Sequence, residues 1–411
     1  MISLTKENII SYIKDHVPSL HFEEPVTIHQ IGDGDLGPEI EGDGYCNYVF
    51  SVSDSKHSVI VKQSPYLLPR RGSKLTPTRS RYEAEIMKVR AAIVHQYVPK
   101  LYHVDHDNHI LIMEDVSNLK LVRFEFNKDH QLPKLAVQGA EYLAATHFYT
   151  SEFFLDTKVF RSLIAHFMNP ELRTVMEKGI FLGIFGADDF DTACGEDFVR
   201  YCKFVFEDPE LKFQRYKLRH LFMSKSETLI HGDFHTSNLF ADDDNLKVID
   251  MEYTFGAPLS YDLGFILSNI IFQFCSAAFR PYDKESERKE CLAYLLTLFR
   301  LLYTNYIKFF FEYWEEDAKI EYKVSKGYKE TIALDILKEC IGFSACVNFS
   351  RVCGTMDTAD FDFIEDNDLR TKAKFLAVDI DVWFFKNWHK YTDIDDVVDD
   401  LLSLMYYRKN K

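Results

Sequence analysis

The spacing of apolar residues changes once along the chain, near residues 115–122. Before this point apolar residues occur in short segments with strand composition, and after it they recur at helical spacing over long segments. This order favours a small sheet followed by a larger helical part. The predicted strands are residues 26–31, 48–52, 58–62, 101–104 and 109–114, with helices over 5–13 and 78–94.

The 411 residues are enough for two lobes, each with its own core. We expect an α+β chain in which residues 1–117 form a small antiparallel sheet with a helix and residues 118–411 form a larger, mainly helical lobe. The helices predicted for the second lobe include residues 132–149, 159–167, 197–206, 265–279, 290–314 and 331–353.

Charge and cysteine content exclude several classes of function. The chain has 48 Lys and Arg against 64 Asp and Glu, and its net charge of -16 repels nucleic-acid phosphates. Its eight cysteines form no C-x-x-C pair, which disfavours a zinc site or a secreted disulfide framework. The most apolar stretches, 265–279 and 295–314, are short or interrupted by charge and are expected to be core helices. We expect a cytoplasmic protein that binds neither nucleic acid nor membrane.

One stretch, HGDFHTSNLFADDDNLKVIDMEYT at 231–254, points to phosphoryl transfer. Transfer from ATP to an alcohol needs a carboxylate that faces the hydroxyl and oxygen ligands that hold Mg2+ on the phosphates. Asp233 is the predicted catalytic carboxylate, in an H-x-D-x-x-x-x-N pattern that ends at Asn238. Asn238 and Asp250 are the predicted Mg2+ ligands. Glu252 would add a further ligand or hold a metal-bound water.

The alternative for this stretch is a solvated turn without function. Composition alone seldom places an acid, an amide and a second acid at this spacing, so the turn is disfavoured. His231, the first residue of the pattern, is expected to brace the loop through hydrogen bonds rather than to take part in the chemistry.

Two glycine-bearing segments precede the second predicted strand, IGDGDLG at 31–37 and EGDGYCN at 41–47. Glycines let a backbone approach a triphosphate closely, so either segment could cover the phosphates. The second runs directly into a strand, which makes Gly42, Gly44 and Asn47 the candidate nucleotide contacts. A plain hairpin turn has the same composition and is the alternative.

Lys62 follows the apolar triplet 59–61 and ends a strand that would pair with the glycine-bearing one. A lysine there can reach the α- and β-phosphates if an acid holds it in place. Glu83 and Glu85 lie two residues apart on the helix 78–94 and face differently. We favour Glu83, because its apolar neighbours indicate an inward-facing position. A surface lysine is the alternative, but the order of loop, lysine, glutamate and H-x-D pattern supports a nucleotide site.

The strand 109–114 ends in Glu114-Asp115-Val116, where the two lobes are expected to meet. In a two-lobe kinase the adenine ring would hydrogen-bond to the backbone at this point. Glu114 and Val116 are therefore candidate adenine contacts, although an ordinary linker would have the same composition.

This ordered set resembles the aminoglycoside phosphotransferase and choline kinase superfamily, whose fold is protein-kinase-like. No A-P-E signature of an activation loop is visible, which favours a small-molecule kinase. Within the superfamily the chain is similar to the 5-methylthioribose kinase family. The stretches that carry this similarity are GDGYCNYVF at 42–50, IVKQSPYLLP at 60–69, IDMEYTFGAPLSYDLGFILSNI at 249–270 and GFSACVNFSRVCGTMDTADFDFIEDNDLR at 342–370.

The resemblance implies an ATP-dependent and Mg2+-dependent kinase that phosphorylates the anomeric 1-hydroxyl of 5-methylthioribose in methionine salvage, and a homodimer. It assigns substrate binding to Asp233 and Arg351, and Arg351 would also stabilise the transferring charge. The chain departs from the family pattern at three places. Ser350-Arg351 stands where the family has two adjacent arginines, RRGSKLTPTR at 70–79 lacks the family's tryptophan, and Ser237-Asn238 replaces a usual Gly-Ser.

Two other hypotheses stay open. The first keeps the chemistry and changes the acceptor to choline, ethanolamine, homoserine, an aminoglycoside or another sugar. A cationic acceptor needs an acidic or aromatic cage, whereas a sugar needs polar groups, and Arg351 in the site would argue against a cation. The second is a catalytically inactive nucleotide-binding scaffold, which is disfavoured because every expected catalytic residue type is present.

Overall fold

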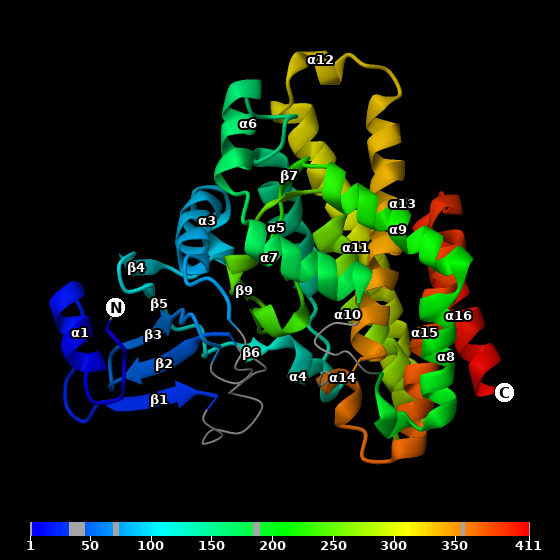
Figure 1. Cartoon of the computed structure of the whole chain (residues 1–411), viewed down its shortest axis with the longest axis horizontal. Coiled ribbons are helices and arrows are strands. Elements are labelled where there is room, and N and C mark those ends of the chain that lie inside the picture. The colour runs from blue at the N-terminus through cyan, green and yellow to red at the C-terminus, as the bar shows by residue number, and fades with distance from the viewer. Residues whose placement is uncertain (1, 33–45, 69–73, 184–189, 355–357, 411) are drawn as a thin grey trace.

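The computed structural model describes residues 2–32, 46–68, 74–183, 190–354 and 358–410. A small sheet lies at one end of the molecule, and helices make up most of the rest (Figure 1). The strands of this sheet are β1 (Thr27–Ile31), β2 (Tyr48–Ser53), β3 (Ser58–Gln63), β4 (Leu101–Asp105) and β5 (Ile110–Glu114). Their order is β1-β2-β3-β5-β4, and all neighbours are antiparallel. The predicted α+β fold class is confirmed.

Alternation of side chains along these strands gives the sheet two buried faces. Val59 and Val61 of β3 join a small core with α1 (Ile9–His16). Leu111 of β5 points the other way and joins the large core, to which α3 (Arg79–Val94) also contributes. One helix therefore covers each face, and α3 connects the sheet to the helical part.

The helical part is built around α10, which packs against α11, α13 and α15, while α5 packs against α11. Its helices are α4 (Val122–Asn127), α5 (Leu135–Tyr149), α6 (Thr157–His166), α7 (Pro170–Met176), α8 (Glu196–Glu207), α9 (Pro209–Ser224), α10 (Tyr261–Phe279), α11 (Glu285–Asp317), α12 (Ile320–Lys323), α13 (Tyr328–Val352), α14 (Ala359–Asp362), α15 (Asn367–Asn387) and α16 (Ile394–Lys409). By length and composition α10 could cross a membrane, but 94% of its apolar window is buried inside the protein. It is a core helix, as the sequence predicts.

Short strands hold the stretch 231–254 in place. β7 (Thr228–Leu229) pairs with β10 (Gly256–Ala257), and β6 (Lys120–Leu121), β8 (Leu239–Ala241) and β9 (Leu246–Val248) form a three-stranded sheet. The pairing of β8 with β9 brings the two ends of the stretch together, and the Ile249 N–H donates to the Asn238 carbonyl at 3.0 Å. Asn238 and Asp250, the residue after Ile249, are the predicted Mg2+ ligands.

All the strands and helices predicted above are present, with ends shifted by a few residues. The largest difference is in α11, which begins at Glu285 and not at 290. Its first turn is polar and so lacks an apolar period, but acidic residues there favour the N-terminal end of a helix. The helices that were not in the predicted set are the long helices α9, α15 and α16 and the short helices α4, α7, α12 and α14.

Candidate active site

Lys62 of β3 lies among three carboxylates. Its Nζ is 2.8 Å from Glu83 Oε2 on α3 and 3.9 Å from Glu252 Oε2, and it also bonds to Asp250. Burial alone would lower the pKa of Lys62, but the charges of Asp250, Glu83 and Glu252 outweigh burial and raise it above its ordinary value. Lys62 is therefore a fixed cation in an acidic site.

The structure pairs Lys62 with Glu83 and not with Glu85. Glu83 is buried, whereas Glu85 turns outward and accepts a hydrogen bond of 2.6 Å from His166 Nε2. Burial raises the pKa of Glu83, the Lys62 charge opposes this rise, and the neighbouring Asp250 adds to it. The ion pair matches the lysine–glutamate pair that orients phosphates in kinases.

Glu252 is held by two side chains that arrive from the sheet side of the site. Asn47 Nδ2 donates to its Oε2 at 3.1 Å, and Arg79 Nε lies 3.3 Å from the same oxygen. Arg79 also donates to Asn47 Oδ1 at 3.0 Å, so the three side chains form a closed triangle. Burial raises the pKa of Glu252, and Lys62 and Arg79 oppose that rise. Gly42 and Gly44 lie outside the described residues.

Asp233 lies between β7 and the short helix Thr236–Asn238. Its Oδ2 is 3.3 Å from His235 Nε2, and its Oδ1 is 3.7 Å from Nη2 of Arg351 at the end of α13. The Ser237 N–H donates to His235 Nδ1 at 3.1 Å, so Nδ1 is an acceptor and Nε2 carries the proton that faces Asp233. Burial would raise the pKa of Asp233, but His235 and Arg351 outweigh it and lower the pKa. Asp233 is thus an ionised carboxylate.

The structure places one arginine beside Asp233. The guanidinium of Arg351 lies over the Phe265 ring, 5.4 Å from its centroid. Ser350, its neighbour in the chain, is buried, and its hydroxyl donates to the Val347 carbonyl at 2.9 Å. The Ser350 side chain therefore bonds within α13. Of the two adjacent arginines expected from the family resemblance, this chain has Arg351.

The loop that carries Asp233 is held in place by α10. Asp262, which is fully buried, accepts hydrogen bonds from the backbone N–H groups of His231 at 2.5 Å and Gly232 at 2.9 Å. Gly232 has a φ of 86°, and a Cβ at this position would lie 2.2 Å from the Tyr253 carbonyl oxygen. The tight turn therefore requires glycine.

His231 acts as a brace, as the sequence suggests. Burial and the nearby Arg90 charge lower its pKa to about 4, so the imidazole is neutral at physiological pH. Its Nε2 donates to the Ile249 carbonyl at 3.0 Å, and its Nδ1 accepts the Asp233 N–H at 3.3 Å. Both ring nitrogens are therefore used to hold the loop against the strand that leads to Asp250.

Asn238 and Asp250 lie on adjoining backbone segments. The Asn238 amide nitrogen donates to the Asp233 carbonyl at 2.9 Å, which leaves its Oδ1 as the oxygen available to a ligand. Asp250 has a φ of 59°, a left-handed conformation that is uncommon outside glycine and concentrates at functional sites. Its side chain is 31% exposed, more than the other two acids around Lys62.

Glu114 and Val116, the predicted adenine contacts, already make hydrogen bonds within the protein. The Glu114 carboxylate accepts the Lys100 N–H at 2.9 Å and Lys247 Nζ at 3.1 Å. The Val116 carbonyl accepts the Leu119 N–H at 2.9 Å and so closes a turn. None of these bonds uses the backbone N–H of Val116, which is the donor that an adenine ring nitrogen would need.

Three residues of the site were missed in the sequence. Arg79, Asp262 and His235 were not among the site residues predicted from the sequence. A signal existed for Asp262, because an acid inside so apolar a helix must meet buried donors. For Arg79 the signal lies in a contact between distant segments, whereas His235 lies two residues from Asp233 in the same loop.

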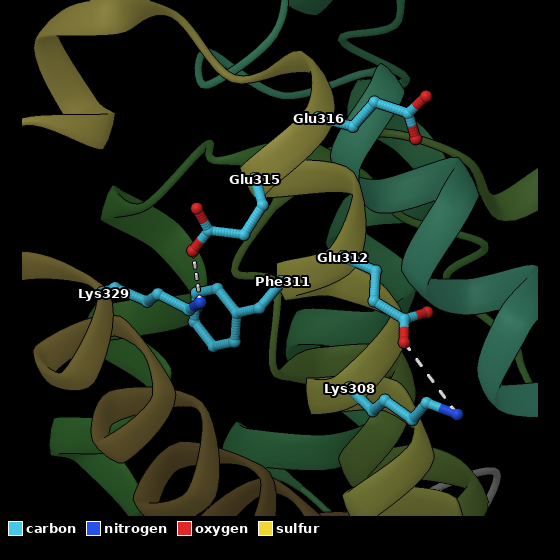
Figure 2. Close-up of a pocket in the computed structure, with 6 residues that line it drawn as sticks. All are labelled: Lys308, Phe311, Glu312, Glu315, Glu316 and Lys329. Atoms are coloured by element: carbon cyan, nitrogen blue, oxygen red, sulfur yellow. Dashed lines mark hydrogen bonds and ion pairs between the residues drawn. The ribbon is translucent and has the colours of Figure 1, made fainter.

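A separate hollow of about 530 Å3 lies on α11 near the start of α13 (Figure 2). Its charges are largely paired, with Lys329 bonded to Glu315 at 2.6 Å and Lys308 lying 3.9 Å from Glu312. None of the candidate catalytic residues lines it. The residues that line it are Lys308, Phe311, Glu312, Glu315, Glu316 and Lys329.

The chain is similar to known families, proteins and structures over most of its length. Residues 40–294 match the phosphotransferase enzyme family. The chain is 31% identical over 365 residues to the methylthioribose kinase of Bacillus velezensis, which covers 87% of this chain and 88% of that one. It is 32% identical over 359 residues to the methylthioribose kinase of Geobacillus thermodenitrificans, and the match covers 86% of this chain and 85% of that one. Choline kinase from Cryptosporidium parvum Iowa II has a TM-score of 0.46 at 14% identity, covering 98% of this chain and 100% of that one. The chain therefore belongs to the phosphotransferase enzyme family and, within it, to the methylthioribose kinase family.

Proposed function

We propose that this chain transfers the γ-phosphoryl group of ATP to the 1-hydroxyl of 5-methylthioribose, a step of methionine salvage, with Mg2+ as cofactor. The observation that carries the proposal is the proximity of Asp233 and Arg351, whose charged groups lie 3.7 Å apart. Asp233 belongs to the phosphotransferase loop, and Arg351 belongs to the segment 342–370, which resembles methylthioribose kinases. One site therefore combines a residue for the reaction with a residue for the substrate.

In this proposal Asp233 accepts the proton of the sugar hydroxyl as the hydroxyl oxygen attacks phosphorus. His235 holds Oδ2 from one side, so Oδ1, which faces Arg351, is the oxygen that meets the hydroxyl. Arg351 binds the sugar and offsets the negative charge on the phosphoryl group in transit. Proton removal by a positioned base of this kind contributes roughly 10²–10⁴-fold to the rate.

The nucleotide would lie against the sheet. Lys62, held by Glu83, reaches the α- and β-phosphates, and backbone groups of Glu114 and Val116 receive the adenine. Gly42, Gly44 and Asn47 belong to the segment that covers the phosphates. The contacts of Asn47 and Arg79 with Glu252 support this arrangement, because Asn47 ends that segment and Glu252 is one of the carboxylates around Lys62.

The donor set of the site fits magnesium. Carboxylate oxygens of Glu83, Asp250 and Glu252 lie within 4.8 Å of one another, and Mg2+ prefers such hard ligands together with waters. We assign Asn238 Oδ1 and Asp250 as direct ligands, and Glu252 as a further ligand or the holder of a metal-bound water. When bound, the ion neutralises charge on the β- and γ-phosphates.

We also propose that the lobes divide between residues 117 and 118 and that the protein is a cytoplasmic homodimer. Phe204 of α8, Phe213 of α9 and Tyr406 of α16 are 58%, 61% and 60% exposed, and a second copy would cover apolar side chains of this kind. Size-exclusion chromatography with light scattering measures the oligomeric state directly. A monomer at micromolar concentration would reject the dimer.

The acceptor is tested by an ATP-consumption assay with methylthioribose, ribose, choline, ethanolamine, homoserine and an aminoglycoside. We expect methylthioribose to give the highest kcat/KM. Turnover of choline without turnover of methylthioribose would replace the proposed acceptor. ATP binding with no turnover of any acceptor would favour an inactive scaffold.

The base is tested by Asp233→Asn. This change should lower kcat by roughly 10²–10⁴-fold and leave ATP binding, measured by calorimetry, largely unchanged. Asp243→Asn is the matched control, because Asp243 is an exposed carboxylate in the turn between β8 and β9. A kcat for Asp233→Asn within a few-fold of the unchanged protein would reject the base role.

A further inference from the structure

A second cluster of metal-binding side chains lies where the end of α1 meets β4. His16, the last residue of α1, lies beside His103 of β4, with ring centroids 4.8 Å apart. Asp105, at the end of β4, completes a set in which one ligand atom from each residue lies within 4.8 Å of the others. We propose that this α1–β4 cluster of His16, His103 and Asp105 binds a divalent transition-metal ion such as Zn2+.

The tautomer of His16 suits a metal ligand. Its Nδ1 lies 2.9 Å from the Tyr12 carbonyl oxygen, and because a carbonyl only accepts, Nδ1 carries the proton. The lone pair of the neutral ring is then on Nε2. Metal-binding histidines commonly donate their other ring N–H to a backbone carbonyl in this way.

His103 supplies an atom that has no other partner. Its Nε2 is buried and makes no hydrogen bond to any of the described residues. A buried polar atom left unpaired costs roughly 1–3 kcal/mol, and an absent ion is one of the ordinary explanations for such an atom. A cation shared with His16 would satisfy it.

Asp105 contributes charge and a fixed orientation. Its Oδ2 accepts the Tyr12 hydroxyl at 2.8 Å and Asn108 Nδ2 at 2.8 Å, which hold the carboxylate beside the two imidazoles. Carboxylates that bind metals are themselves usually hydrogen-bonded in this manner. His16 is also the final residue of its helix, and the negative end of the helix dipole favours a cation there.

The types of ligand in the α1–β4 cluster favour a transition-metal ion over Mg2+. Two imidazoles and one carboxylate suit Zn2+, Co2+ or Ni2+, whereas Mg2+ prefers a shell made of oxygens. Three protein ligands leave a fourth position for water. Because β4 is an edge strand of the five-stranded sheet, an ion in the α1–β4 cluster would fasten the N-terminal helix to that edge.

The test is Zn2+ binding by the whole chain, followed by equilibrium dialysis in excess Mg2+, which occupies oxygen-rich sites. We expect the unchanged protein to bind one more Zn2+ than His103→Ala and His16→Ala, or to bind it at least about tenfold more tightly. The second variant matters because His16 is exposed, so we expect its removal to leave the fold intact. His21→Ala, which removes an exposed histidine outside the cluster, should bind Zn2+ like the unchanged protein.

Thermal unfolding gives a second readout. Zn2+ should raise the Tm of the unchanged protein and of His21→Ala more than that of either cluster variant, because an ion bound only to the folded state stabilises it. Kinase turnover should be the same in all four proteins, since the cluster contains none of the residues of the active site. Equal Zn2+ stoichiometry and affinity in the unchanged protein and both cluster variants, or no Zn2+ retained by the unchanged protein, would overturn the proposal.

Discussion

The Asp262 carboxylate accepts the backbone N–H of His231 at 2.5 Å, across 31 positions of sequence. It also accepts Gly232 N–H at 2.9 Å and bonds to His147 Nε2 at 3.1 Å. Burial would raise the pKa of Asp262, but these donors outweigh it and lower the pKa. The loop that carries Asp233 is therefore fixed by a buried anion on the central helix.

Asp262→Asn should therefore harm both stability and turnover. One carboxylate oxygen becomes an amide nitrogen, which cannot accept the backbone proton it faces, and a buried unpaired donor costs roughly 1–3 kcal/mol. Urea denaturation should show this loss, and kcat should fall more than the KM for ATP. Asp244 is an exposed carboxylate on the turn between β8 and β9, and Asp244→Asn should change neither the stability in urea nor kcat. A stable Asp262→Asn protein with full kcat would refute the bracing role.

The periodic parts of this fold were predictable and the long-range polar contacts were not. Apolar spacing records which face of an element is buried, so it gave the strands, the main helices and the inward position of Glu83. It does not record which polar group a buried side chain meets. Arg79 reaches Glu252 across the site, and Asp262 meets His231 on another element, so neither partner is visible in local sequence. The H-x-D-x-x-x-x-N pattern is an exception, because its members are close in sequence.

Glu83→Gln and Glu85→Gln form a matched pair on α3. Glu83→Gln removes one of the three charges that hold Lys62, and removal of one partner from a buried ion pair is destabilising, by about 3–5 kcal/mol at the upper end. The KM for ATP should rise and kcat/KM should fall by tenfold or more, where tenfold corresponds to about 1.4 kcal/mol. Glu85→Gln should have little effect, because its contacts to Arg81 and His166 are at the surface. Similar kinetics for the two variants would contradict this assignment.

Arg79→Lys tests the triangle with Asn47 and Glu252. Lysine keeps the charge but cannot bond to the Asn47 side chain and to Glu252 in the fixed fork of arginine. We expect the KM for ATP to rise about tenfold, with a smaller change in the KM for the acceptor. Arg81→Lys is the control, since its side chain is 47% exposed and two residues away on the same helix. Equal changes in the two Michaelis constants would show that Arg79 acts on the whole fold and not on the nucleotide side.

His235→Ala should move the acid limb of the pH–rate profile to higher pH. In the proposed role of Asp233 as a base, activity is present above its pKa and is lost as the pH falls through it. Burial raises the pKa of Asp233, and the hydrogen bond from His235 lowers it. Removal of His235 leaves burial less opposed, so the pKa of Asp233 rises and the loss of kcat/KM begins at a higher pH. His235→Gln, which can keep a donor near Oδ2, should shift the limb less, and His130→Ala, at an exposed histidine, should not shift it. An unchanged limb in His235→Ala would mean that His235 does not set the protonation of Asp233.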